Sequence, residues 1–110
     1  MQPIVFETLA DPARRRIVEV LRGGEKAVND IVEQMEIHQS GVSRHLRLLS
    51  EAGFVQVRPD GARRLYSLRR EPFDELDAWL SQFKKTWDAR LDRFAAELER
   101  RKKARKDQKP

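Results

Sequence analysis

Apolar residues recur at helical spacing through the first half of the chain. Ile17, Val20 and Leu21 share one face of a segment that Asp11 and Pro12 can begin. Asp is a favourable N-cap, and Pro at the first helical position removes no donor that the helix needs. The same spacing predicts three further helices, at residues 4–9, 28–35 and 39–52. We therefore expect four helices around one small core.

The pattern changes after Gly53 from helical spacing to alternation. Apolar residues at positions 54, 55 and 57 lead to Asp60 and Gly61, and Tyr66 and Leu68 alternate beyond this turn. Gly accepts the positive φ of a tight turn, so two short alternating runs joined by Asp-Gly predict a β-hairpin. Next to a pair of helices, such a hairpin is typical of a wing.

Helical periodicity returns at Glu71 and continues for about thirty residues, with a spacing close to a heptad. The apolar positions are Phe73, Leu76, Leu80, Phe83, Trp87, Leu91, Phe94 and Leu98. A lone helix with such a stripe is unfavourable in water, so the first seven of these residues are predicted to form a dimer interface. The alternative is that the stripe only covers this domain's own core.

These elements predict a fold that is mainly α-helical with a small β-hairpin wing. It is a winged helix-turn-helix with a long C-terminal dimerisation helix. Residues 1–98 are expected to form the DNA-binding and dimerisation domain. Residues 99–110 are expected to be a basic, frayed and mobile tail that adds nonspecific affinity for DNA.

The second helix of the predicted helix-turn-helix has a polar outer face. Its inward positions are Val42, Leu46 and Leu49, which leaves Gln39, Ser40, Ser43, Arg44 and Arg47 facing outward. Gln39 and Arg44 are long enough to reach base edges in a major groove, whereas Ser40, Ser43 and Arg47 suit phosphate contacts. Gly41 either allows a close approach to phosphate or is tolerated near the helix start.

Positive charge is concentrated in two segments. Residues 38–70 hold seven basic residues against two acidic ones, and residues 99–110 hold the same numbers. Such a distribution favours a polyanionic partner. Arg58, Arg63 and Arg64 flank the hairpin turn, where a basic wing can place an arginine in a minor groove. The alternative is that these arginines only keep the hairpin soluble.

Composition excludes several kinds of site. The chain has 110 residues, 37% of them charged, and no cysteine, so disulfides and thiolate metal sites are excluded. Its two histidines are too few for a tetrahedral metal site, and we expect neither a metal nor a cofactor. No apolar run approaches the roughly 18 residues of a membrane span, and the N-terminus does not resemble a secretion leader. We therefore expect a cytoplasmic protein that does not contact membranes.

Four blocks of sequence together resemble the arsenic-repressor (ArsR/SmtB) family of bacterial regulators. They are Leu9–Ile17, Gln39–Leu49, Glu51–Val55 and Gly61–Tyr66, in the family's order and spacing, and the likeness extends over residues 4–98. The resemblance implies a dimeric repressor that binds an imperfect palindrome. It also places His45 at the DNA-contacting face together with its neighbours, whereas helical geometry alone leaves His45 between core and groove.

The departures from the family concern the effector. Metal-sensing members carry cysteines on the third helix or Asp, His and Glu ligands on the last helix, and this chain has neither set. The predicted function is a homodimeric, sequence-specific repressor of double-stranded DNA, whose effector the sequence does not identify. The alternative is a protein-interaction module that docks a partner on the C-terminal helix. An enzyme is not expected, because no nucleophile is paired with a base.

Overall fold

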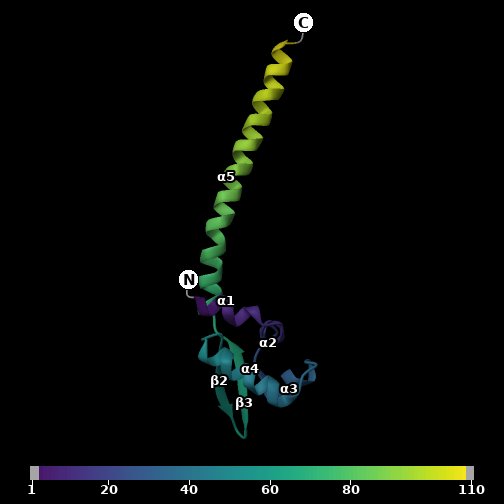
Figure 1. The fold of residues 1–110 in the computed structure, drawn as a ribbon, viewed down its shortest axis with the longest axis vertical. Coiled ribbons are helices and arrows are strands. Elements are labelled where there is room, and N and C mark those ends of the chain that lie inside the picture. Colours follow the sequence, from purple (N-terminus) through teal and green to yellow (C-terminus); the bar gives the residue numbers. More distant parts are fainter. Residues whose placement is uncertain (1–2, 109–110) are drawn as a thin grey trace. The chain divides into compact units, whose positions relative to one another are not determined.

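The computed structural model describes residues 3–108, which form two compact units, one ending at Leu76 and the other beginning at Asp77 (Figure 1). The first unit contains helices α1 (Pro3–Ala10), α2 (Pro12–Leu21), α3 (Val28–Glu33) and α4 (Gln39–Glu51), and strands β1 (Lys26–Ala27), β2 (Val55–Asp60) and β3 (Arg63–Leu68). Helix α5 (Glu71–Gln108) begins in the first unit and makes up the described part of the second. The predicted fold class is confirmed.

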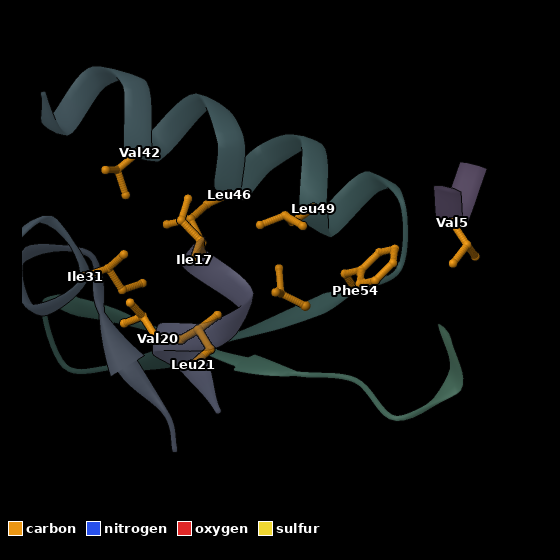
Figure 2. Close-up of a cluster of buried hydrophobic side chains, with 10 residues drawn as sticks. Val5, Ile17, Val20, Leu21, Ile31, Val42, Leu46, Leu49 and Phe54 are labelled. Carbon is orange, nitrogen blue, oxygen red and sulfur yellow. The ribbon is translucent and has the colours of Figure 1, made fainter. Parts of the chain in front are cut away.

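The core of the first unit is built from the positions that the periodicity predicted. Ile17, Ile31, Val42, Leu46 and Leu49 are completely buried, and they converge from α2, α3 and α4 (Figure 2). Phe54 closes this cluster, and its ring meets that of Phe73 edge-on with the centroids 5.7 Å apart. This shared core holds α4 against α2 and α3.

Local signals fix the ends of α2 and α4. The Asp11 carboxylate accepts hydrogen bonds from the amides of Ala13 (2.8 Å) and Arg14 (3.3 Å), as an N-cap does. The guanidinium of Arg14 in turn donates to the carbonyl of Thr8 at 2.8 Å, which joins α2 to α1. Gly53, with φ of +80°, follows α4 and turns the chain into β2.

The wing is larger than the sequence predicted. Strands β2 and β3 form the expected hairpin with Asp60 paired to Arg63, so Gly61 and Ala62 are the two turn residues, and Gly61 has φ of +61°. In addition, β1 pairs with β3, giving the strand order β1-β3-β2. The two-residue Lys-Ala strand has no recognisable periodicity, which is why sequence patterning missed it.

Helix boundaries differ from the predicted ones at two places. Helix α3 ends at Glu33 instead of Met35, and α5 continues to Gln108, past the predicted end near Leu98. Arg100 and Arg101 pair with Glu97, and Lys102 pairs with Glu99, so ion pairs one turn apart support the last turns. The expectation that residues 99–108 fray from the helix is therefore wrong for this structure, whereas the mobility of the tail stays a prediction.

Candidate nucleic-acid interface

Helix α4 presents a polar outer face. Val42, Leu46 and Leu49 are fully buried, so any rotation of the helix about its axis would expose core side chains. The orientation of the outer face is therefore fixed. The outward side chains are all exposed, as the sequence predicted: Gln39, Ser40, Ser43, Arg44 and Arg47. Arg44 makes no ion pair within the described residues, and Arg47 makes only a loose one, 4.0 Å from Glu51. Both guanidinium groups are therefore accessible to an anion.

The start of α4 also agrees with the prediction. His38 occupies the N-cap with extended backbone, and the helix begins at Gln39. The side chain of His38 makes no capping hydrogen bond. The amides of the first turn are consequently not capped by a side chain, and amides at a helix N-terminus are good donors to phosphate.

A groove separates α4 from the wing. It has a volume of about 510 Å³. Ser43 and Arg47 line it from α4, and Arg64 lines it from β3. Arg64 has no ion-pair partner among the residues that the structure describes. The structure thus brings three of the predicted contact residues around one groove, whose lining holds two arginines and one carboxylate, that of Glu51.

The other two wing arginines are already engaged. Both the Nε and an Nη atom of Arg58 donate to the carboxylate of Glu25, at 2.8 and 2.7 Å, and this hydrogen bond raises the pKa of Arg58. Arg63 donates to Asp60 across the turn at 3.0 Å. Arg58 therefore ties the hairpin to the segment before β1, a role that sequence reasoning missed because Glu25 lies 33 residues away.

His45 lies on the inward-turning edge of α4. It is half-buried, and its Nδ1 is enclosed without a hydrogen-bond partner in the described part of the chain. Burial works against ionisation of Asp11, yet the amides of Arg14 and Ala13, with the nearby charges of His45 and Arg14, lower the pKa of the Asp11 carboxyl. His45 is thus close to the start of α2, and its contact with DNA stays a prediction.

The predicted dimer-interface residues divide into two groups. Phe73 and Leu76 pack against the core of the first unit. The remaining residues are 45–62% exposed and follow one face of α5: Leu80, Phe83, Trp87, Leu91 and Phe94. Phe83 packs edge-on against Trp79, and the Arg90 guanidinium lies 5.2 Å from the centre of the Trp87 ring. Helix α5 therefore presents a continuous apolar stripe to its surroundings.

Two further kinds of site are not found in the part of the chain whose side chains the structure describes, residues 4–106. No group of three or more His, Asp or Glu side chains lies close enough together there to bind a metal ion. None of the described helices combines the length and the hydropathy needed to cross a bilayer.

The arrangement of α3, α4 and the wing defines a winged helix-turn-helix protein of the DNA-binding class. Residues 11–57 match the family described as "Bacterial regulatory protein, arsR family". The chain is 32% identical over 79 residues to the transcriptional repressor SdpR of Bacillus subtilis, covering 72% of this chain and 88% of that protein. It is 36% identical over 90 residues to the transcriptional regulator Rv2034 of Mycobacterium tuberculosis, covering 82% and 81%.

Solved structures agree with these sequence matches. A crystal structure of an ArsR family transcriptional regulator, RHA00566, superposes with a TM-score of 0.68 at 26% identity, over 77% of this chain and 88% of that one. A possible transcriptional regulator for arsenical resistance gives 0.65 at 39% identity, over 72% and 82%. The chain belongs to the arsR family of bacterial regulatory proteins, which confirms the resemblance found in its sequence blocks.

Proposed function

We propose that this protein is a transcriptional repressor that binds an inverted-repeat operator as a homodimer. The observation that carries the proposal is the exposed outer face of α4, which is polar and basic and borders the groove that Arg64 lines. A relative of this chain, SdpR, is itself named a transcriptional repressor. The proposed activity is reversible binding in the cytoplasm, without catalysis.

Each part of the face has a different task in this proposal. Gln39 and Arg44 read base edges, because their side chains are long and Arg44 has no competing ion pair within the described part of the chain. Ser40, Ser43, Arg47 and Arg64 contact phosphate on either side of the groove. Arg58 contributes by holding the wing through Glu25, and Arg63 reaches phosphate only after exchanging its bond to Asp60.

The apolar stripe of α5 supports the homodimer in this proposal. A second copy would cover the side chains that are about half exposed in one chain. Dimerisation would also present two recognition helices to half-sites about one DNA turn, roughly 34 Å, apart. An inverted repeat is the sequence that such two-fold symmetry would read.

Selection of bound sequences from a random DNA pool tests the proposal. The purified protein is used at about 150 mM salt with a chelator present, because salt at this level weakens nonspecific phosphate binding. We expect an inverted repeat with half-sites about one turn apart. Enrichment of no sequence at all would reject the specific regulator. It would favour the second candidate, a module that docks a partner protein on the stripe of α5.

A further inference from the structure

The last described turns of α5 are strongly basic. Residues 99–106, here called the basic segment, hold six basic residues against one acidic residue, and every side chain in the segment is exposed. At a rise of about 1.5 Å per residue, the six positive charges are spread over about 10 Å of helix axis, or roughly one per 2 Å. Double-stranded DNA carries one negative charge per about 1.7 Å of its axis, so the two charge densities are comparable.

The positive charges surround the helix. Successive residues of an α-helix are about 100° apart, because one turn takes 3.6 residues. With this spacing the six basic residues leave no sector of the circumference wider than about 100° without a positive charge. Helix α4, in contrast, has one buried face and one polar face. A helix that is basic on every side cannot select bases through one face, but it can contact phosphates in any orientation.

Half of the cations already have a partner in the same helix. Glu97 pairs with Arg100 and Arg101, and Glu99 pairs with Lys102. The other three form no ion pair among the residues that the structure describes: Lys103, Arg105 and Lys106. These three side chains are therefore available to an external anion.

Like charges in the basic segment lie one helical turn apart. Lys106 is four residues from Lys102 and three from Lys103, and like charges at these spacings destabilise a helix. The helix dipole favours cations near a C-terminus, which offsets part of this repulsion. The neighbouring carboxylates, Glu97 and Glu99, are already engaged. A bound polyanion would relieve the repulsion that remains.

We propose that the basic segment binds the phosphate backbone of double-stranded DNA without sequence preference, through Lys103, Arg105 and Lys106. The inference rests on the proposed function, because binding of α4 to an operator raises the local concentration of phosphate around every other part of the same chain. Each of the three cations releases counterions from the DNA that it contacts. The basic segment thus adds affinity, whereas α4 supplies the specificity.

The composition of the segment favours DNA over a membrane surface. A helix that lies on a bilayer buries an apolar face among the lipids. Ala104 is the only apolar residue of the basic segment, and the apolar stripe of α5 ends before it, at Leu98. The segment therefore has charge to offer but no apolar face, which suits a highly charged phosphate backbone.

The salt dependence of binding to a duplex of unrelated sequence tests the proposal. One variant replaces the three free cations: Lys103→Gln, Arg105→Gln and Lys106→Gln. Gln has a helix propensity close to that of Lys and Arg, so α5 should keep its length. A matched control removes three exposed cations from the middle of α5, which form no ion pair in the described part of the chain: Lys84→Gln, Lys85→Gln and Arg93→Gln.

The slope of log K against log salt concentration should become shallower by up to about 2.7 per chain in the first variant, because each phosphate contact contributes about 0.9. Between about 50 and 200 mM salt, the parent protein should then lose up to about 40-fold more affinity than this variant. The control should keep the parent slope. An unchanged slope in the first variant, or an equal change in the control, would overturn the proposal.

The length of the duplex identifies which DNA supplies the phosphates. An operator of two half-sites is compared with the same operator extended by about 10 base pairs, one helical turn, on each side. If the segment contacts the operator duplex, the extension should strengthen binding of the parent protein more than that of the first variant. If it contacts a second duplex, the extension should have no effect, and the parent complex should sediment with two duplexes at low salt. Either result agrees with the proposal.

Two comparisons separate this inference from the proposed function. The first variant should keep the ratio of operator affinity to unrelated affinity, whereas Arg44→Ala should lower it. If no sequence were preferred but the first variant still lost salt dependence, the proposed repressor would fail and the basic segment would stand. If the first variant bound DNA like the parent but lost binding to vesicles of equal parts phosphatidylglycerol and phosphatidylcholine, the proposal would be overturned in favour of a membrane contact.

Discussion

The two units of this protein share one sequence pattern, apolar residues at helical spacing, but differ in how far those residues are buried. In the first unit, apolar residues at helical spacing close on one another, and Ile17, Leu46 and Leu49 are completely buried. In the second unit, equally regular apolar residues from Leu80 to Leu98 remain about half exposed. The first unit buries the core faces of its helices within itself, although Ile4, Phe6 and Val57 stay 42–45% exposed. The second unit consists of one helix in its described part.

The difference shows what periodicity can and cannot predict. Helical spacing identifies the residues that share a face, because side chains three and four positions apart lie together. It does not identify what covers that face, which depends on other elements or on another chain. A substitution in the core of the first unit is therefore expected to change stability by the same amount at every protein concentration. A substitution on the stripe of the second unit is expected to change stability only where the protein associates.

The largest expected effect comes from opening the core of the first unit. Leu46→Ala removes a fully buried side chain from α4 and should lower the free energy of unfolding by about 2–5 kcal/mol. Leu91→Ala is the matched substitution on the stripe, where the side chain is 61% exposed. We expect it to lower the thermal midpoint only at concentrations at which the protein is a dimer. Thermal unfolding at several protein concentrations measures both effects.

If both variants lowered the stability equally and at every protein concentration, the proposed difference between the two units would be wrong. This result would mean that Leu91 is buried within its own chain, and that α5 is covered without a partner.

The next effect should separate binding to DNA from association. Arg44→Ala removes an exposed guanidinium from the outer face of α4 and should weaken operator binding by about 1–3 kcal/mol, without changing the oligomeric state. Arg64→Ala should weaken binding to all sequences alike and reduce the salt dependence, because its expected contact is a phosphate. Fluorescence anisotropy with operator and unrelated duplexes, over a range of salt concentrations, measures these differences.

Arg58→Ala is the matched control on the wing, since Arg58 already donates to Glu25 at 2.7 Å. Its effect on operator affinity should be the smallest of the three. If it weakened binding as much as Arg44→Ala did, the assignment of Arg58 to the support of the wing would be wrong.

The fold could be predicted largely from sequence, because its core depends on local periodicity. Asp11-Pro12, the alternation beyond Gly53 and the inward residues of α4 are each visible within one segment. Strand β1 and the pair between Arg58 and Glu25 were missed, because both depend on segments that meet only after folding. Residues 99–108 were expected to fray, because composition does not reveal that Glu97 and Glu99 pair with the basic residues that follow.

A smaller effect is expected at the cap of α2, which belongs to the first unit alone. Asp11→Ala should lower the free energy of unfolding by about 1 kcal/mol, because two amides lose their acceptor. The pKa of Asp11 is lowered in the folded state, so its stabilisation is present above the unfolded pKa of about 3.9. It is lost as the pH falls through the folded-state pKa.

Asp11→Asn keeps an acceptor at the cap but does not titrate, so its unfolding should depend less on pH below about pH 4. Chemical denaturation of the parent protein, Asp11→Ala and Asp11→Asn between pH 3 and 7 measures how the free energy of unfolding of each depends on pH. Identical pH profiles for the parent protein and for Asp11→Asn would show that the cap does not carry the dependence.

The smallest expected effect concerns Gly41, near the start of α4. A Cβ atom there would lie 3.5 Å from the Cδ1 of Ile37, an ordinary contact, and the φ of Gly41 is not positive. Gly41→Ala should therefore raise the free energy of unfolding by up to about 1 kcal/mol, because Ala is the better helix former. The added methyl group faces Ile37, so operator affinity should not change. Loss of affinity in this more stable variant would instead show that the backbone at Gly41 approaches phosphate closely, which would extend the contact surface of α4 to its main chain.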